Sequence, residues 1–378
     1  MKSLHRIFFE SSNKMDAVED GSVELVVTSP PYPMIEMWDQ QFSQINPKIK
    51  ECLERNEGIN AFELMHQELD KTWNEIYRVL KDGAIICINI GDATRKIGDS
   101  FQLFSNHSRI LHHFIALGVQ ILPEILWRKQ SNKPNKFMGS GMSPPNAYVT
   151  LEHEYILILR KGKNREFKEE SKQPRDESAY FWEERNAWFS DNWTDLKGID
   201  QKLNTNLAQR ERSAAYPFEL VYRLINMFSI KGDLVLDPFL GTGTTLMAAM
   251  ASSRNSIGFE VDQGFKEVIQ NRLQNTTDFL NDYLVKRVTQ HLEFVKEMDK
   301  NNRALKYKSD LYHFKVVTNQ ETKICFNFVK EIKTANAMHE VTYYDEKMNQ
   351  NIIENIINNC RIEFISDEKK VTFQQKLR

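Results

Sequence analysis

The segment at residues 232–262, GDLVLDPFLGTGTTLMAAMASSRNSIGFEVD, constrains the fold of this chain more than any other part of it. A run of strand-forming residues leads into a turn that contains Gly241 and Gly243, and a helix is predicted from Thr244. A second strand-forming run then ends at Glu260. A strand, a glycine turn, a helix and another strand in this order predict a unit of a parallel α/β sheet.

The same segment predicts a binding site. Glycines let the backbone turn and approach a ligand closely, and a helix that begins there presents free N–H groups. Glu260 follows the first glycine by roughly 20 residues, which suits a carboxylate that binds the two hydroxyls of a ribose. A dinucleotide-binding fingerprint has a third glycine where Leu246 stands, so the pattern favours a nucleoside over a pyrophosphate. A glycine turn without any ligand is the alternative.

The alternation of strands and helices extends over most of the chain. Seven apolar runs are predicted to be buried strands, at residues 6–10, 23–28, 84–90, 119–127, 154–160, 233–236 and 256–260. Apolar residues recur at helical spacing in residues 62–80 and again in residues 218–228. We therefore predict a Rossmann-like, doubly wound α/β fold whose sheet-forming part spans about residues 1–262.

Two regions depart from this alternation. Residues 129–208 are polar, basic and aromatic, with one strand-like run inside them. Residues 265–298 predict one or two long amphipathic helices, and the sequence beyond them is rich in Lys, Asn and Glu, with strand-like runs such as residues 323–329.

Composition limits the class of protein. The chain has 378 residues, 41% of them hydrophobic and 27% charged, which is typical of a globular protein with one large domain or two ordinary ones. Its net charge of −2 excludes a global basic field, although a local basic patch can still bind nucleic acid. The four cysteines stand far apart and predict reduced thiols without a metal site. No apolar run approaches membrane length, so we expect a cytoplasmic protein.

The strand-like run at residues 23–28 ends in an unusual loop, Ser29-Pro30-Pro31-Tyr32. This TSPPY sequence at residues 28–32, together with DPFLGTGTT at residues 237–245, resembles the amino-group DNA methyltransferases that use S-adenosylmethionine. The loop precedes the glycine turn, which is similar to the permuted motif order of the β class. Weaker matches, such as IYRVLKDGAIICINIGD, EILWRK, HEYILILRK and RSAAYPFELVYRLINMFSIKGD, extend the resemblance over about residues 5–262.

The resemblance implies a domain organisation. The catalytic domain, residues 1–262, is expected to contain the mostly parallel, seven-stranded methyltransferase sheet in circularly permuted order. A target-recognition region is expected at about residues 130–212, inserted between matched motifs. Residues 263–378 are expected to form a C-terminal accessory domain, helical at first and then mixed. The resemblance also implies a prokaryotic enzyme.

The chemistry of methyl transfer gives the opening loop a role. An exocyclic amine on a base is a weak nucleophile, so catalysis needs acceptors that hold its hydrogens and turn its lone pair toward the methyl group. The hydroxyl of Ser29 and the carbonyl of Pro30 are candidate acceptors. Pro30 and Pro31 keep the loop rigid because their φ angles are fixed. The ring of Tyr32 offers a face on which a flipped base can stack.

The resemblance also implies a cofactor site for S-adenosylmethionine. Glu260 is expected to hold the ribose and Glu10 to approach the adenine, while the backbone of the glycine turn approaches the methionine part. Asp237 either faces the ammonium group or is a structural carboxylate at the helix start. The candidate cofactor-binding residues are Glu10, Asp237, Pro238, Phe239, Gly241, Thr242, Gly243 and Glu260.

A flipped base requires contacts to duplex DNA, and phosphate contacts require cations. The candidates flank two predicted strands: Arg128, Lys129, Lys133, Lys136, Arg160 and Lys161. A solvated charged surface is the alternative. Residues 181–212 carry three tryptophans among polar residues, a mixture that suits base and sugar contacts and equally a local apolar core.

Several functions remain open at this point. A serine in the first position of the loop motif favours cytosine N4 as the methylated amine, with adenine N6 as the alternative. Outside this class, a nicotinamide-dependent oxidoreductase or a non-catalytic DNA-binding module would use the same segments. Expected partners are double-stranded DNA and a cognate restriction endonuclease, and both a monomer and a dimer are compatible with the sequence.

Overall fold

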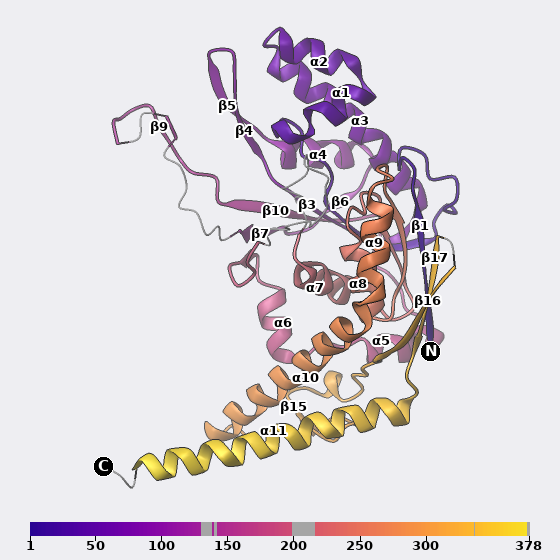
Figure 1. The fold of residues 1–378 in the computed structure, drawn as a ribbon, viewed down its shortest axis with the longest axis vertical. Helices are drawn as coiled ribbons and strands as arrows, with labels where there is room; N and C mark the ends of the chain where they lie inside the picture. The colour runs from indigo at the N-terminus through magenta and orange to yellow at the C-terminus, as the bar shows by residue number, and fades with distance from the viewer. Residues whose placement is uncertain (130–137, 140–141, 199–215, 336, 376–378) are drawn as a thin grey trace.

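The computed structural model describes residues 1–129, 138–139, 142–198, 216–335 and 337–375 (Figure 1). Its strands are β1 (Lys2–Phe8), β2 (Val23–Thr28), β3 (Leu80–Ile90), β4 (Ala93–Ile97), β5 (Ser100–Phe104), β6 (Gln120–Ile121), β7 (Ile125–Arg128), β8 (Met138–Gly139), β9 (Ala147–Tyr148), β10 (His153–Arg160), β11 (Asn192–Trp193), β12 (Leu234–Asp237), β13 (Asn255–Phe259), β14 (Tyr307–Lys308), β15 (Lys315–Val316), β16 (Val329–Ala335) and β17 (Met338–Tyr343). Its helices are α1 (Asp39–Ile45), α2 (Pro47–Glu54), α3 (Gly58–Val79), α4 (Asn106–Ala116), α5 (Glu169–Glu177), α6 (Trp182–Trp188), α7 (Phe218–Phe228), α8 (Thr244–Ala251), α9 (Phe265–Gln274), α10 (Thr276–Lys300) and α11 (Glu346–Gln375), with short 3-10 turns at Glu36–Trp38 and Asn319–Glu321.

One large sheet organises the molecule. Within the described residues it has eleven strands in the order β11-β7-β10-β3-β2-β12-β13-β1-β17-β16, and β6 also pairs with β10. The five central strands, from β3 to β1, are parallel to one another. β10 and β17 border this parallel centre and run antiparallel to it. The predicted doubly wound α/β fold with a largely parallel centre is confirmed.

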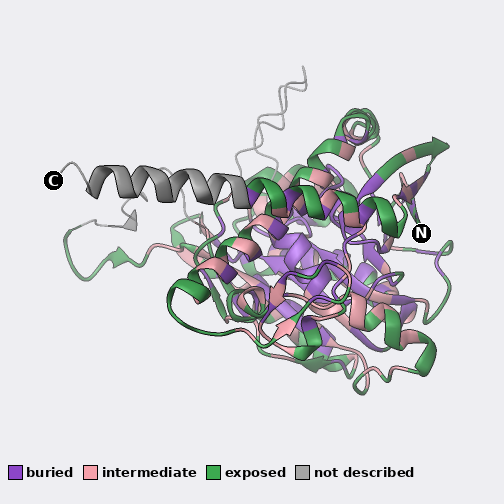
Figure 2. Ribbon diagram, turned by 90° about the horizontal axis from the view of Figure 1, so that it is seen from below, coloured by how far each residue is buried: buried purple, intermediate pink, exposed green. Residues whose placement is uncertain are grey.

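The alternation of side chains along the strands divides the core into two layers. In β2, Leu25 and Val27 lie in the cluster formed with α7, α8 and α10. Val26, between them, lies in the cluster formed with α3 and α4 on the other face. All three are at most 1% exposed, and burial of each such side chain contributes roughly 1.5–3 kcal/mol. Figure 2 shows the buried residues at the centre and exposed residues on the outer turns of the helices.

The sheet is larger than the predicted seven strands because the C-terminal part of the chain joins it. β17 pairs with β1, and β16 continues the sheet beyond β17. The two predicted helices are confirmed as α9 and α10, and Val288 of α10 is fully buried in the same core as the sheet. Residues beyond the expected boundary at residue 262 thus contribute strands to the sheet and side chains to its core.

Two strand predictions need correction. The run at residues 119–127 is divided into β6 and β7, because Pro123 between them has no N–H group for a continuous ladder. The run at residues 323–329 is largely without strand pairing, and β16 begins only at Val329. Ile324, Phe326 and Phe328 are nevertheless buried, so their alternation reflects packing in the core.

Two of the three tryptophans in the tryptophan-rich segment pack into the core, which favours the apolar-core alternative for these two side chains. Trp188 and Trp193 are 5% and 1% exposed, and the indole N–H of Trp193 donates to the carbonyl of Trp188. Arg287 of α10 lies over the ring of Trp188 and forms an ion pair with Glu184 of α6. α6 and β11 are thus bound to the body of the molecule; Trp188 and Trp193 serve as an apolar core, whereas Trp182 is 38% exposed.

Two buried histidines predict sensitivity to acid. His5 and His66 are fully buried, and burial lowers the pKa of each to about 3. Because the folded pKa lies below the unfolded value of about 6.5, the unfolded state binds more protons, and stability is lost as pH falls from about 6.5 to about 3. At pH 5 the two residues together are expected to cost roughly 4 kcal/mol relative to pH 7.

Urea unfolding at pH 7 and pH 5 measures this loss. A His5→Gln/His66→Gln variant is expected to lose markedly less stability between the two pH values than the wild type, whatever its absolute stability. Equal losses in the two proteins would show that these histidines do not cause the acid sensitivity.

Candidate active site

The parallel centre of the sheet brings the predicted motifs to one edge. Carboxyl ends of parallel strands meet at the same edge, which is where α/β sheets bind ligands. The Ser29 loop follows β2, the glycine turn follows β12, and Glu260 follows β13. Since β2, β12 and β13 are neighbours in the sheet, these three segments lie side by side. Glu10, exposed, follows β1 at the same edge.

The loop at residues 29–32 is held by its surroundings. Pro30, Pro31 and Tyr32 are buried, whereas Ser29 is partly exposed. The Ser29 Oγ lies 3.2 Å from the hydroxyl of Tyr32. The side-chain amide of Asn106, at the start of α4, donates to the carbonyls of Pro33 and Gly91 at 3.1 and 2.9 Å. The loop is therefore tied to the end of β3, and Ser29 lies where solvent or a ligand can reach it.

The hydroxyl of Tyr32 is part of a polar network. It donates to Glu154 Oε2 at 2.9 Å and accepts from the Asn89 amide at 2.8 Å. Lys129 binds the other carboxylate oxygen of Glu154 at 3.0 Å. Burial, and then the charge of Glu154, raise the pKa of Tyr32 well above its ordinary value. Tyr32 is therefore a neutral hydrogen-bond donor at physiological pH.

The glycine turn has the predicted conformation. Gly241 and Gly243 have φ angles of +53° and +82°, in the left-handed region that favours glycine. Gly243 is the N-cap of α8, and its N–H donates to the carbonyl of Leu240 at 3.0 Å. Arg272 of α9 donates to the carbonyl and the hydroxyl of Thr242, both at 2.7 Å. The glycine turn is thus held by α9, a helix that follows the segment containing the turn.

Glu260 lies directly against this turn. Its Oε2 accepts a hydrogen bond from the Gly241 N–H at 2.9 Å, and its Oε1 accepts one from the Asp262 N–H at 2.8 Å. The residue is 9% exposed. A carboxylate oxygen can accept more than one hydrogen bond, so this position remains suited to vicinal hydroxyls.

Asp237 has a structural role, in contrast to the expectation that it faces an ammonium group. Its carboxylate is 1% exposed and accepts four hydrogen bonds from the protein. The donors are the hydroxyls of Thr28, Tyr216 and Thr245, at 2.7, 3.0 and 2.6 Å, and the N–H of Phe239 at 3.1 Å. Burial raises its pKa, and these bonds, first those from Thr245 and Thr28, oppose the rise. Four donors match the roughly four lone-pair sites of a carboxylate, which favours the structural alternative.

The predicted DNA-contacting cations are divided between the two edges of the sheet. Lys129 lies at the edge of the candidate site, as does Arg128, which forms an exposed ion pair with Glu152. Arg160 and Lys161 lie at the opposite edge, because β10 runs antiparallel to β3 with Arg160 beside Ile85. The Lys161 Nζ donates to the carbonyls of Tyr77 and Leu80, at the end of α3.

Lys161 therefore caps a helix, and neither it nor Arg160 lies at the edge of the candidate site. Lys133 and Lys136 lie outside the described residues.

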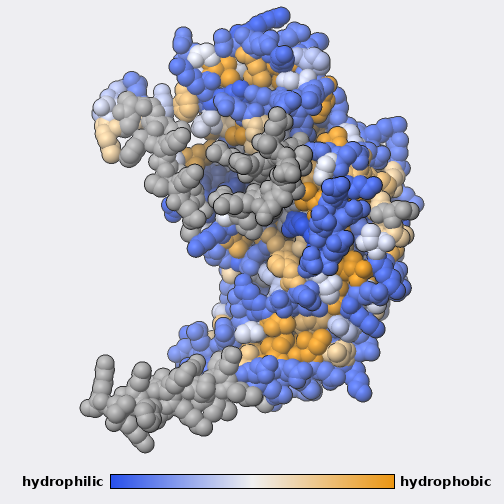
Figure 3. All heavy atoms as spheres, viewed as in Figure 1, coloured by the Kyte–Doolittle hydropathy of each residue, from blue (hydrophilic) through white to orange (hydrophobic). Residues whose placement is uncertain are grey.

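Two hairpins flank the candidate site. β4–β5 follows the end of β3, and β8–β9 lies between β7 and β10, so both leave the sheet at the edge of the site (Figure 1). The rings of Phe101 and Tyr148 stack between the hairpins with centroids 4.7 Å apart. In the space-filling view the molecule is hollowed on one side, below the lobe that carries the hairpins (Figure 3).

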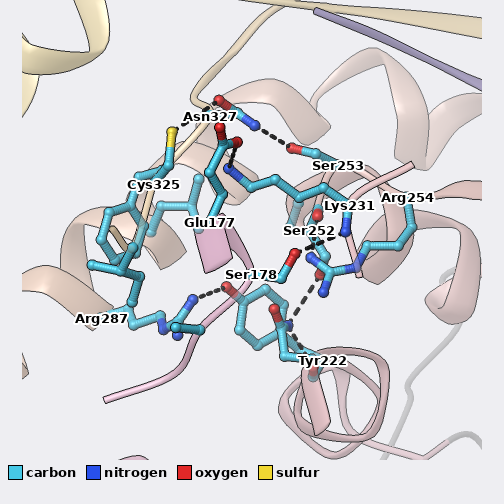
Figure 4. A pocket seen from close by; sticks show the side chains of 16 residues that line it. Glu177, Ser178, Tyr222, Lys231, Ser252, Ser253, Arg254, Arg287, Cys325 and Asn327 are labelled. Carbon is cyan, nitrogen blue, oxygen red and sulfur yellow. Dashed lines mark hydrogen bonds and ion pairs between the residues drawn. The ribbon is translucent and has the colours of Figure 1, made fainter. Parts of the chain in front are cut away.

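A polar cavity behind the sheet is separate from this site. It has a volume of about 20 Å³ and lies between α7, α8, α10 and the segment at residues 324–327 (Figure 4). Lys231 points into it, 3.5 Å from a carboxylate oxygen of Glu177, and burial lowers the pKa of Lys231. This volume is enough for a water molecule and far too small for a nucleoside.

Two kinds of feature are absent from the part of the chain that the structure describes. Three or more His, Cys, Asp or Glu side chains are nowhere placed to hold a metal ion. Nor does any helix among these residues have the length and apolarity needed to cross a membrane.

The sequence did not identify four residues that organise the site: Asn89, Asn106, Glu154 and Tyr216. Asn89 stands in the apolar, buried part of β3, and a polar residue there is a sequence signal that could have found it; Glu154 stands beside His153 at the start of β10 and is less conspicuous. Asn106 and Tyr216 carry no local signal, since their roles follow from contacts with distant segments.

Comparisons with known proteins agree with this geometry. The N6_N4_Mtase family model, described as DNA methylase, matches residues 23–271. The Type II methyltransferase M.MthZI of Methanothermobacter thermautotrophicus is 55% identical over 349 residues, covering 92% of this chain and 96% of the relative. M.MjaI of Methanocaldococcus jannaschii, also a Type II methyltransferase, is 53% identical over 281 residues, covering 71% and 91%. The solved structure of a putative DNA modification methylase of Thermus thermophilus, in complex with S-adenosyl-L-methionine, is 30% identical, covers 72% of this chain and 95% of its own, and has a TM-score of 0.55.

Proposed function

Since the chain belongs to the N6/N4 family of DNA methylases, we propose that it transfers a methyl group from S-adenosylmethionine to the N4 amine of a cytosine flipped out of duplex DNA. One observation carries the proposal. The Ser29 loop and the glycine turn leave the neighbouring parallel strands β2 and β12 at the same edge. A base acceptor and a nucleoside-type ligand can therefore meet there.

The residues at the turn fit S-adenosylmethionine. When bound, this cofactor supplies a methyl group made electrophilic by a positively charged sulfur. Gly241 leaves the backbone open, because a Cβ atom there would meet only the carbonyl oxygen of Phe239, at 4.0 Å. Glu260, bonded to the same Gly241 N–H, would hold the ribose hydroxyls. Pro238, Phe239, Thr242 and Gly243 would contribute the remaining wall, and Glu10 would approach the adenine.

The loop residues act on the base. The Ser29 hydroxyl and the Pro30 carbonyl would accept the two hydrogens of the amine, which turns its lone pair out of conjugation and toward the methyl donor. Pro30 and Pro31 hold these acceptors still because their φ angles are fixed. The Tyr32 ring would stack on the flipped base, a contact worth roughly 1–3 kcal/mol in single-strand binders.

The hairpins suit the DNA. β4–β5 and β8–β9 both leave the sheet at the edge of the site, from strands on the β3 side of β2, so we propose that they contact the duplex from which the base is taken. We propose that target recognition uses the predicted region at about residues 130–212, which contains β8–β9, together with the hairpin β4–β5. Arg128 and Lys129 are the described cations of the original set that lie at this edge.

The methylated ring is the finer part of the proposal. Serine at the first position of the motif favours cytosine N4, and adenine N6 is the alternative. Mass spectrometry of nucleosides from unmodified DNA incubated with the protein and S-adenosylmethionine is expected to detect N4-methylcytosine, with a reaction lacking the cofactor as control. N6-methyladenine without N4-methylcytosine would overturn the choice of ring, and neither product would overturn the reaction.

The biological setting follows from the relatives. M.MthZI and M.MjaI carry the names of Type II methyltransferases, which modify DNA in restriction-modification systems. We extend the proposal to such a system in a prokaryotic cytoplasm, with a cognate restriction endonuclease that cuts the same DNA site when it is unmodified. Family membership leaves no support for a nicotinamide-dependent oxidoreductase.

A further inference from the structure

We propose that Glu154 is a positioning residue that holds the ring of Tyr32 in the orientation in which a flipped base stacks on it. The inference rests on the proposed function and assigns to it a residue outside the SPPY loop. Glu154 lies near the start of β10, two strands from the loop, at the edge of the sheet where the base would bind.

The contacts of the carboxylate carry the proposal. Glu154 Oε2 accepts hydrogen bonds from the Tyr32 hydroxyl at 2.9 Å and from the Asn89 amide at 2.7 Å. Glu154 Oε1 accepts one from the Lys129 Nζ at 3.0 Å. The Glu154 side chain is 14% exposed and that of Lys129 is 39% exposed. Both carboxylate oxygens are thus held by hydrogen bonds. One accepts from β3 and the loop, and the other accepts from the residue that follows β7.

The ring itself is fixed in two ways. A Cβ atom at Gly91 would lie 3.0 Å from Tyr32 Cε2 and 3.4 Å from Glu154 Cγ, so both side chains pack against the bare backbone at the end of β3. This packing sets the plane of the ring. The hydroxyl bonds to Glu154 and Asn89 set the direction of its long axis. Together these contacts hold the ring of Tyr32, a residue that is 8% exposed, in one orientation.

The charge of Glu154 matters as well as its shape. Its neighbours Asn89 and Lys129 both donate hydrogen bonds, and the neutral phenol of Tyr32 donates a third. A carboxylate accepts all three, whereas a glutamine amide of the same size must turn an NH₂ group toward at least one donor. Glu154→Gln therefore preserves the volume of the side chain while releasing part of the network.

A double-mutant cycle tests the inference. Single-turnover methylation of unmodified DNA is compared for the wild type, Glu154→Gln, Tyr32→Phe and the double variant. We expect each single variant to be slower by roughly tenfold, with affinity for S-adenosylmethionine unchanged. Since Glu154 acts through a hydroxyl that Tyr32→Phe lacks, the double variant is expected to be little slower than either single variant.

Three outcomes would overturn the inference. They are a wild-type rate in Glu154→Gln, single effects that multiply in the double variant, and a loss of cofactor affinity that accounts for the slower rate. Thermal unfolding of each variant separates these results from a loss of fold. Glu340→Gln is the matched control, because Glu340 pairs with Lys2 on β1, away from the loop, and should leave the rate unchanged. The nucleoside assay on the wild type tests the proposed function separately.

Discussion

Replacing Ser29 with alanine is expected to slow single-turnover methylation by roughly 100- to 1,000-fold, the usual effect of removing one hydrogen-bonding group that orients a reaction centre. Ser29 is the partly exposed residue of an otherwise buried loop, and its hydroxyl is proposed to accept a hydrogen of the amine. Without it, the lone pair of the amine is no longer turned toward the methyl donor. Transfer of radioactive methyl groups to DNA measures the rate.

The same variant is expected to bind S-adenosylmethionine with nearly wild-type affinity, which calorimetry measures. Ser22→Ala provides a matched control, because Ser22 precedes the same strand at its other end and its hydroxyl donates to the carbonyl of Glu19. Retention of more than half the wild-type rate by Ser29→Ala would contradict the assigned role. A large loss in Ser22→Ala would mean that the strand itself, and not the loop, is sensitive to substitution.

Replacing Glu260 with alanine is expected to weaken binding of S-adenosylmethionine by roughly 10- to 100-fold, the value of one or two hydrogen bonds to a charged group. Two effects contribute. The proposed bonds to the ribose are lost, and so is the bond that holds the Gly241 N–H at 2.9 Å. Titration calorimetry in the absence of DNA measures the dissociation constant without any contribution from the chemical step.

Glu267→Gln is the control for this second experiment. Glu267 is an exposed carboxylate on α9, a few residues beyond Glu260, so the variant removes one negative charge from the same region. It should bind the cofactor as the wild type does. Wild-type affinity in a folded Glu260→Ala protein would remove Glu260 from the cofactor site.

Local patterns predicted the centre of the fold well. β2, β12 and β13 lie within a residue or so of their predicted ranges, because their apolar runs are short and end at turn residues. The pairing of β17 with β1 was not predictable, since it joins residues about 340 positions apart, such as Lys2 and Thr342, and depends on register. The burial of Trp188 and Trp193 could not be predicted, because their neighbours in the sequence are polar and only the segments packed around them in the fold decide it.

The candidate site, like the fold, could be predicted only in part from the sequence. The loop at Ser29 and the turn at Gly241 are contiguous motifs whose chemistry could be recognised from their residues. Glu154 and Asn89 reach the Tyr32 hydroxyl across separations of 122 and 57 residues, and nothing in a linear pattern connects them. Asp237 was placed at the right turn, but its partners Thr28 and Tyr216 decide its role, and they come from other segments.

The position of β1 has a consequence for how the protein is made. This strand lies between β13 and β17 in the sheet, and both of these partners are synthesised hundreds of residues after it. Contacts between such distant segments form slowly, because the entropy cost of closing a long loop comes before any stabilising contact is made. β1 therefore lacks its partners on both sides until β13 and β17 have been synthesised. Charged and polar residues along β1, such as Lys2 and Arg6, oppose aggregation while the strand is unpaired.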